Sequence, residues 1–273
     1  MNREDREMTK RFEGKTAVIV GGAGGIGWAI TQGLISEGAK VTVGDMDQTL
    51  LDSMVEEFGS DLVCVRTDAT KQDEQKALVD TAVRKFGKLD IAFNVAGGSK
   101  MGLIDEGSVD DWDWTVDLCL KGTYLGMRYQ LRAMKENGGG SIVNISSINA
   151  VNPAWADSAY NAAKNGVISL TQTAVIENAK YGIRCNAVLP GLTDTKMTQS
   201  WWKVPEIREA YMNKIPMKRK GQPEEVGKAA LFLASDDASY INAASLLVDG
   251  GRAAAGYPNF IEALEKDRTL WEV

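Results

Sequence analysis

The sequence predicts a single α/β domain built on a doubly wound parallel sheet of seven strands. Short runs rich in valine and isoleucine recur along the chain without the alternation of polar and apolar residues that marks half-exposed strands. Such runs suit strands that are buried on both faces. Longer stretches with helical spacing separate the runs, and strands joined through helices require right-handed crossovers, which place helices on both faces of the sheet.

The expected elements alternate from residue 16 onward. Strands are expected at residues 16–20, 41–44, 62–65, 90–94, 141–145, 183–189 and 245–248. Helices are expected at residues 26–37, 48–58, 72–86, 109–136, 158–181 and 224–235. Glycines stand where helices end and suit C-terminal caps at Gly38, Gly59, Gly87 and Gly182. The chain has no internal repeat or low-complexity linker, which favours one domain over residues 14–252.

Three segments depart from this alternation of strands and helices. Residues 1–13 carry many charges of both signs and no apolar run, so we expect a mobile leader rather than a signal peptide. Residues 192–220 contain tryptophans and prolines and are expected to form a lid over a substrate site. Residues 253–273 are expected to form a C-terminal extension with a short helix at 259–268.

The composition excludes several classes of function. The 273 residues include no histidine, which excludes Ser-His-Asp and Cys-His hydrolases, histidine-ligated zinc sites and histidine proton shuttles. The net charge of −6 argues against nucleic-acid binding as the main task. Three widely spaced cysteines form neither a metal-ligand pair nor a disulfide framework, so we expect no metal and a cytoplasmic location.

A glycine-rich turn follows the first strand and opens the first helix. The uncharged stretch 16–36 is long enough to span a membrane, but its six glycines suit a tight turn better than a lipid-facing helix. Gly21, Gly25 and Gly27 have the spacing GxxxGxG, and residues without a Cβ let the backbone approach a pyrophosphate at the helix N-terminus.

Asp45 stands where the second strand ends, 18 residues beyond Gly27. A carboxylate there can accept hydrogen bonds from ribose hydroxyls, and it repels a 2′-phosphate. No arginine or lysine near Met46 neutralises such a phosphate, so this position favours NAD over NADP. The alternative is that Asp45 is a solvated turn residue.

A Ser, Tyr and Lys set follows the fifth strand. Tyr160 and Lys164 are four residues apart on an expected helix and therefore share one face. A nearby ammonium stabilises a phenolate and lowers its pKa. Ser147 ends the fifth strand, and the carboxyl ends of strands line the ligand crevice of such sheets, so Ser147 can meet Tyr160 there. The alternative is a surface Tyr-Lys pair without function.

These motifs together resemble the short-chain dehydrogenase/reductase family, in particular an NAD-preferring member of its shorter-chain branch. Further family landmarks are Asn94-Val95-Ala96-Gly97, Pro190-Gly191 and Val248-Asp249-Gly250-Gly251. The resemblance implies a Rossmann-type domain and hydride transfer between a secondary alcohol and its ketone, with NAD as the cofactor. It also implies a homotetramer built on the helices expected at 109–136 and 158–181.

The resemblance assigns roles to individual residues. Tyr160 exchanges the hydroxyl proton, Ser147 binds the substrate oxygen, and Lys164 binds the nicotinamide ribose and lowers the pKa of Tyr160. Tyr160 and Lys164 thus also contact the cofactor. The other implied cofactor contacts are Gly21, Gly25, Ile26, Gly27, Asp45, Met46, Asp68, Ala69, Asn94, Ala96, Gly97, Pro190, Gly191, Thr193 and Thr195.

Cys119 departs from the family pattern, because many members carry an asparagine at this position to support the proton path. A thiol is a weak hydrogen-bond partner, so Cys119 is a candidate that tunes turnover. The alternative, which the general habit of buried cysteines favours, is that Cys119 only packs in its helix. The departure also motivates an alternative function, a non-catalytic NAD(H)-binding regulator, against which the intact Ser147, Tyr160 and Lys164 argue.

The substrate side is expected to include aromatic walls, which suit an apolar or ring-bearing alcohol or ketone. The candidate substrate contacts are Ser147, Asn149, Trp155, Tyr160 and Trp201. The alternative for Trp201 is that it only packs the lid against the body of the domain.

Overall fold

The computed structural model describes residues 10–255 and has the expected alternation of strands and helices. The strands are β1 Thr16–Val20, β2 Lys40–Asp45, β3 Leu62–Arg66, β4 Ile91–Asn94, β5 Gly140–Ile145, β6 Ile183–Pro190 and β7 Ser245–Val248. The helices are α1 Gly25–Ser36, α2 Gln48–Phe58, α3 Gln72–Phe86, α4 Val109–Val116, α5 Gly122–Glu136, α6 Ser158–Asn178, α7 Lys196–Trp202, α8 Pro205–Lys214 and α9 Pro223–Ala234.

The seven strands form one parallel sheet in the order β3-β2-β1-β4-β5-β6-β7, which confirms the predicted fold class. The chain builds outward from β1 to β3 and then returns to β4 on the other side of β1. The register pairs Val20 with Asn94, so the segments that follow β1 and β4 leave the sheet side by side. This reversal of strand order is where ligands bind in open α/β sheets.

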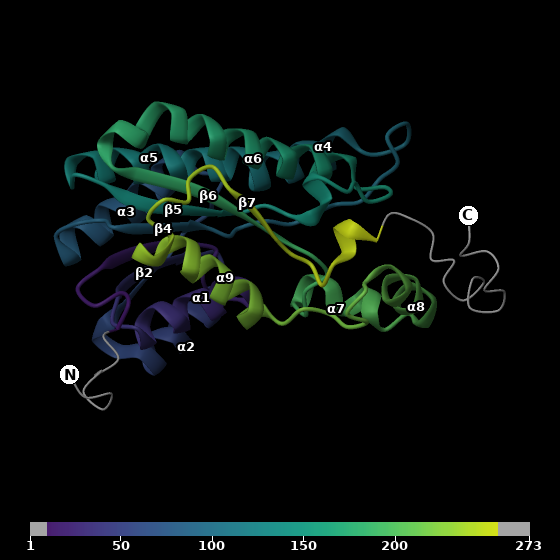
Figure 1. Ribbon diagram of the computed structural model, residues 1–273, viewed down its shortest axis with the longest axis horizontal. Coiled ribbons are helices and arrows are strands. Elements are labelled where there is room, and N and C mark those ends of the chain that lie inside the picture. The colour runs from purple at the N-terminus through teal and green to yellow at the C-terminus, as the bar shows by residue number, and fades with distance from the viewer. Residues whose placement is uncertain (1–9, 256–273) are drawn as a thin grey trace, which may run out of the picture.

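Helices cover both faces of the sheet (Figure 1). Helices α1, α2 and α9 pack on one face, and α3, α4, α5 and α6 lie over the other. The side chains of β1 alternate between the two faces of the sheet. Ile19 belongs to the core under α1, while Val18 and Val20 belong to the core under α3. Burial on both faces explains why the strand sequences lack polar alternation.

The segment before β1 corrects the expected leader. Phe12 is 1% exposed and belongs to the core that α1 and α9 cover. Its backbone N–H donates to the Glu37 carbonyl, and the Arg11 guanidinium pairs with the Glu37 carboxylate. Residues 10–13 are therefore anchored to the folded domain by an apolar side chain and an ion pair. Residues 1–9 and the helix expected at 259–268 lie outside the described residues.

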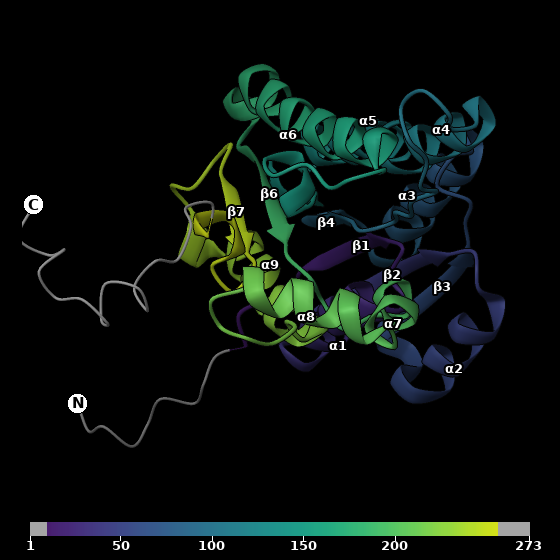
Figure 2. The ribbon, with the colours of Figure 1, turned by 90° about the vertical axis from the view of Figure 1, so that its right-hand side faces the viewer.

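Two long segments differ in detail from expectation. The helix expected over residues 109–136 consists of α4, a π-helical turn at Asp117–Lys121, and α5. The segment 192–220 contains α7 and α8, which lie beside the carboxyl ends of the strands (Figure 2). The uncharged stretch 16–36 divides into β1 and α1, and across residues 10–255 no helix is long and apolar enough to cross a membrane.

Candidate active site

A cavity of about 830 Å³ opens at the carboxyl ends of the strands. Its volume falls within the range of roughly 300–1,000 Å³ typical of small-molecule and cofactor sites. Many of the residues expected from the sequence line it: Gly21, Gly25, Ile26, Asp45, Met46, Ala69, Ala96, Gly97, Ser147, Tyr160, Lys164, Pro190, Gly191, Thr193 and Thr195. The sheet thus brings together predicted residues that lie up to 174 positions apart in the sequence.

The glycine-rich turn leaves backbone donors free at the start of α1. A Cβ on Gly27 would lie 2.0 Å from the Gly21 carbonyl oxygen, and one on Gly21 would lie 2.6 Å from the Ala96 nitrogen. Neither position can hold a side chain without moving the backbone. Helix α1 begins without a side-chain cap and without an acidic residue in its first turn. Its first N–H groups are therefore available to an anion such as a pyrophosphate.

Asp45 points its carboxylate into the same turn. One oxygen accepts the Ala23 N–H at 3.0 Å and the other accepts the Asp47 N–H at 3.2 Å. These contacts hold the carboxylate at the edge of the cavity, between the glycine turn and α2. The basic residues of the cavity lining are Lys164 and Lys196, and neither belongs to the segment that follows Asp45.

Ser147, Tyr160 and Lys164 meet at the carboxyl end of β5. Lys164 is 2% exposed, and its Nζ donates to the Ile145 carbonyl at 2.8 Å and lies 5.4 Å from the centroid of the Tyr160 ring. The Ser147 hydroxyl oxygen accepts a backbone N–H at 3.0 Å, which leaves its own proton free to donate. A Cβ on Gly97 would lie 3.1 Å from Lys164 Nζ, so a glycine there makes room for the ammonium.

The electrostatics of the phenol differ from expectation. Burial raises the pKa of Tyr160 well above its ordinary value, the neighbouring Cys119 and Asp157 raise it further, and a hydrogen bond with Ser147 lowers it. Burial also lowers the pKa of Lys164, which Cys119 partly offsets. The lowering of the Tyr160 pKa expected from Lys164 is thus not the net result. The physical reason is that desolvation of the phenol outweighs the groups that stabilise its charge.

Cys119 lies in the π-helical turn behind this set and is fully buried. Its Sγ donates to the Gly98 carbonyl at 3.1 Å and accepts the Gly98 N–H at 3.4 Å. Its own carbonyl accepts the Thr123 hydroxyl at 2.8 Å. Cys119 does not line the cavity, but its thiol holds the loop that follows β4.

Several other predicted residues lie outside the cavity lining. They are Gly27, Asp68, Asn94, Asn149, Trp155 and Trp201. Asn94 is buried in the core, where its amide bonds Gln130 at 2.9 Å and Asn144 at 2.8 Å.

Asp68 accepts both the backbone N–H of Thr70 at 2.9 Å and its hydroxyl at 2.7 Å. Burial alone would raise the pKa of Asp68, but the Thr70 contacts and the nearby Lys71 and Arg66 hold it below its usual range. Asp68 thus braces the turn beside Ala69, which does line the cavity.

The predicted substrate contacts are dispersed. Trp155 is 86% exposed on the surface, and the Asn149 amide donates to Asp157 at 3.2 Å. Trp201 is partly buried, and the ring of the adjacent Trp202 lies 4.7 Å below the Lys220 ammonium.

Among the lining residues that the sequence did not predict, two groups lie at the starts of helices. Lys196, Met197 and Thr198 come from the start of α7, and Pro223 and Glu224 come from the start of α9. Both groups follow an N-cap that forms a capping box, Thr195 for α7 and Gln222 for α9. A residue that can cap a helix precedes each group. This is the sequence signal that could have identified these positions.

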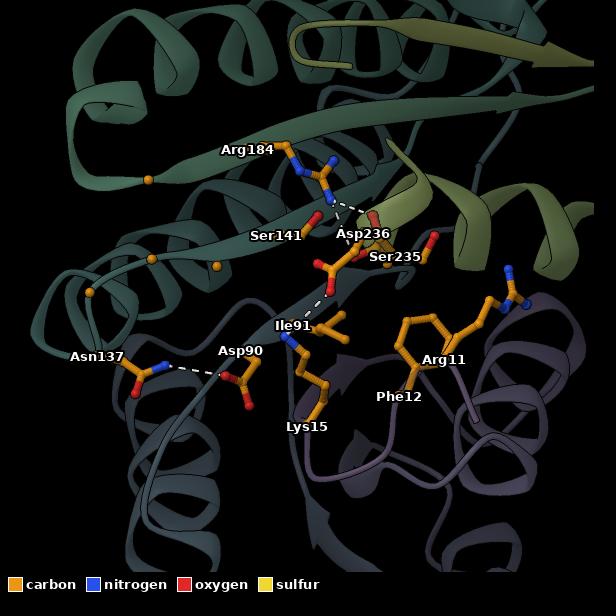
Figure 3. Close-up of a pocket in the computed structure, with 15 residues that line it drawn as sticks. Arg11, Phe12, Lys15, Asp90, Ile91, Asn137, Ser141, Arg184, Ser235 and Asp236 are labelled. Atoms are coloured by element: carbon orange, nitrogen blue, oxygen red, sulfur yellow. Dashed lines mark hydrogen bonds and ion pairs between the residues drawn. The ribbon is translucent and has the colours of Figure 1, made fainter. Parts of the chain in front are cut away.

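A second hollow of about 240 Å³ lies at the opposite, amino-terminal edge of the sheet (Figure 3). Its central side chain, Arg184, donates to the Leu233 carbonyl at 2.8 Å and to the Ser235 carbonyl at 2.9 Å. The guanidinium thus satisfies the last carbonyls of α9. Lys15 lies 3.9 Å from Asp236 at the rim. These groups partner one another, so we assign the hollow a structural role.

The described residues contain no cluster of three or more potential metal ligands of the His, Cys, Asp and Glu types. Cys64, Cys119 and Cys185 are free thiols. The large cavity is lined by a tyrosine, a serine and two lysines, and by the carboxylates Asp45, Asp47 and Glu224.

Comparison with known proteins agrees with this geometry. Residues 21–253 match the family described as enoyl-(acyl carrier protein) reductase. Glucose 1-dehydrogenase 2 of Bacillus subtilis (strain 168) is 36% identical over 263 residues, which cover 93% of this chain and 100% of that protein. The 3-alpha-(or 20-beta)-hydroxysteroid dehydrogenase of Mycobacterium tuberculosis (strain ATCC 25618 / H37Rv) is 36% identical over 258 residues, covering 94% and 96%.

A solved short-chain type dehydrogenase/reductase from Mycobacterium ulcerans superimposes with a TM-score of 0.87 at 33% identity, covering 94% of this chain and 96% of that one. Levodione reductase gives a TM-score of 0.85 at 32% identity, covering 90% and 100%. The family match spans residues 21–253, a range that contains the glycine turn and Ser147, Tyr160 and Lys164. The chain belongs to the short-chain dehydrogenase/reductase family.

Proposed function

We propose that the protein is an NAD-dependent oxidoreductase that transfers hydride between a secondary alcohol and its ketone. The observation that carries the proposal is the convergence of Ser147, Tyr160 and Lys164 on the cavity that the glycine turn also lines. Proteins of this family use NAD or NADP. The relatives named for glucose and hydroxysteroid dehydrogenation support an alcohol or ketone as the substrate.

The residues present fit a nicotinamide dinucleotide. The uncapped first turn of α1 offers N–H groups to the pyrophosphate, and Asp45 offers carboxylate oxygens to the adenosine ribose. The segment directly after Asp45 contributes no basic residue to the lining, which supports NAD over NADP. Lys164 is positioned to bind the nicotinamide ribose. When bound, the nicotinamide ring supplies the hydride donor or acceptor.

Ser147 and Tyr160 of the chain bind the substrate oxygen and transfer its proton. Ser147 already accepts a backbone N–H, so its hydroxyl proton can be donated to the substrate oxygen. Tyr160 then passes a proton between its Oη and that oxygen. Because burial raises the pKa of Tyr160, the phenol is protonated at neutral pH and ready to donate to a carbonyl oxygen. Alcohol oxidation needs the phenolate, so its rate should rise with pH.

The expected homotetramer remains part of the proposal. Apolar side chains are exposed on the layer of helices that the family resemblance assigns to assembly, and they are Trp112, Trp114, Tyr124, Ile176 and Tyr181. Exposed aromatic and aliphatic residues of this kind are typical of protein interfaces. A cytoplasmic location is proposed with it, supported by the three free thiols.

A panel of cyclic and aryl secondary alcohols, mixed with the protein and NAD, tests the function. We expect NADH absorbance to appear with at least one alcohol and to be weaker with NADP. Tyr160→Phe should abolish oxidation while leaving the Kd for NAD nearly unchanged, because the phenylalanine keeps the ring and removes only the proton-transferring oxygen. Alcohol oxidation by the Tyr160→Phe variant would contradict the proposed mechanism. Tight NAD binding without turnover on the whole panel would instead support a non-catalytic regulator.

A further inference from the structure

Asp157 is a buried carboxylate that the proposed mechanism does not use. It is 5% exposed and precedes Tyr160 by three residues at the start of α6. An aspartate at this position ordinarily caps its helix, yet the Asp157 side chain makes no capping bond to α6. Its carboxylate instead accepts the Ser99 hydroxyl and the Asn149 amide, the latter at 3.2 Å.

These two donors come from separate loops of the site. Ser99 follows Gly97 and Gly98 in the loop after β4, and Asn149 follows Ser147 in the turn after β5. The backbone reinforces the link to the first loop, because the Gly102 N–H donates to the Ala156 carbonyl at 2.7 Å. Asp157 thus joins the start of α6 to the segments after β4 and β5.

The second link leads directly to the candidate catalytic hydroxyl. The Asn149 side chain donates to Asp157, and the Asn149 backbone N–H donates to the Ser147 hydroxyl oxygen at 3.0 Å. A side chain that fixes Asn149 therefore also fixes the N–H that orients Ser147. The Ala156 backbone has a φ of +55°, a strained conformation for alanine that surrounding contacts must maintain.

We propose that Asp157 is a positioning residue that, through Ser99 and Asn149, aligns the loops after β4 and β5 with the start of α6 and so sets Ser147 opposite Tyr160. The kinetic part of this inference rests on the proposed function. Both donors to the carboxylate are neutral, so the ionised form is the one that accepts both hydrogen bonds.

The charge of Asp157 also acts on the phenol. The groups facing Tyr160 are Lys164 on α6, Cys119 in the π-helical turn, Ser147 after β5, and Asp157 itself. Burial is the largest cause of the raised pKa of Tyr160, Cys119 raises it further, and Asp157, whose charge disfavours the phenolate, adds to both. Burial raises the pKa of Asp157, whereas its bonds with Ser99 and Asn149 lower it. The aligned carboxylate thus adds to the effect of burial, which keeps the proton on Tyr160.

Three variants separate the two effects. Asp157→Asn keeps the shape and can bond both neighbours, but it removes the charge. Asp157→Ala removes the charge and both hydrogen bonds. Ser99→Ala removes one hydrogen bond and keeps the charge, which makes it the matched control.

Hydrogen exchange followed by mass spectrometry tests the positioning without any substrate. In Asp157→Ala we expect amides of residues 97–102 and 147–150 to exchange about tenfold faster, while the strands keep their protection. Unchanged exchange in both segments would overturn the positioning role. If Asp157→Ala fails to fold, Asn149→Ala breaks the same link from the other side and should loosen residues 147–150.

The pH profile of alcohol oxidation tests the charge. In Asp157→Asn we expect the midpoint of the rising limb to move to lower pH by about half a unit, with no such movement in Ser99→Ala. An equal shift in both variants, or a shift in neither, would overturn the electrostatic part. Should the wild-type protein oxidise no alcohol, the proposed function fails, whereas the exchange measurement still decides whether Asp157 positions the loops.

Discussion

At the scale of single residues, Cys119 shows how a departure from the family pattern is accommodated. Its thiol donates to the carbonyl and accepts the N–H of the same residue, Gly98. An asparagine amide also offers one donor and one acceptor group, so the thiol provides a weaker version of the same pair of contacts. The expectation that Cys119 only packs is therefore incomplete, because the residue is both buried and bonded to the loop after β4.

Substitution at Cys119 separates these roles. Cys119→Asn should keep kcat within a few-fold of the wild type, because the amide can bond Gly98 from the same position. Cys119→Ala removes both contacts and leaves a small cavity, so we expect a lower kcat and a loss of about 1–2 kcal/mol of unfolding free energy. Steady-state kinetics and urea unfolding measure these effects. Equal kcat and pH profiles for all three proteins would show that the position is indifferent.

The sequence predicted those site residues that belong to motifs with a physical reason for their spacing. Asp45, Ser147, Tyr160 and Lys164 all line the cavity, because strand ends and one helical face bring them there. Asp157 was not predicted, because its role depends on the approach of two loops that are far apart in sequence. The same holds for the net pKa of Tyr160, since spacing reveals the neighbouring lysine but not the burial of the phenol.

At the scale of elements, the strands were predictable because burial on both faces leaves a plain apolar signal. Four glycines expected to end helices have positive φ, and they are Gly38, Gly59, Gly87 and Gly182. The π-helical turn at Asp117–Lys121 was not predictable, because helical spacing is the same on either side of it. Tertiary contacts also decide the segment 192–220, where an isolated bridge between Thr193 and Gly221 closes the base of the segment that carries α7 and α8.

The base of this segment suggests an element-scale prediction. Lys220 is nearly buried, its Nζ pairs with Asp194 at 2.7 Å, and it lies over the ring of Trp202 in α7. Lys220→Met keeps the aliphatic stem and removes the charge, which should loosen α7 and α8. We expect a several-fold higher KM for the alcohol and faster proteolysis within residues 196–214. Lys203→Met, an exposed lysine in the same segment, is the control. Equal KM and proteolysis for both variants would contradict a role for the Lys220 contacts.

At the scale of the whole molecule, the absence of histidine has a thermodynamic consequence. No side chain in the chain has an unperturbed pKa between 5 and 8. Stability depends on pH only where the folded and unfolded states bind different numbers of protons. We therefore expect a nearly flat free energy of unfolding between about pH 6 and 8.

Above this plateau the thiols of Cys185 and Cys64 and the phenol of Tyr160 set the slope. Burial raises the pKa of Cys185 from 9.0 to about 12, and burial together with nearby Asp52 and Asp45 raises the pKa of Cys64 from 9.0 to about 11. The pKa of Tyr160 is raised above 10.0. Above pH 9 the unfolded chain loses these protons while the folded protein keeps them, so the free energy of unfolding falls with pH. Lys164, whose pKa is lowered, acts in the opposite direction.

Urea unfolding at successive pH values, in the presence of a reductant, measures this slope. Each group that is ionised only in the unfolded chain contributes a fall of about 1.4 kcal/mol per pH unit. Cys64→Ala should make the decline between pH 9 and 11 shallower by up to that amount, because the half-buried thiol no longer releases a proton on unfolding. The same substitution should leave the plateau between about pH 6 and 8 flat, since a thiol stays protonated there in both states. A decline that begins below pH 8, or one that Cys64→Ala leaves unchanged, would show that other groups control the alkaline limit.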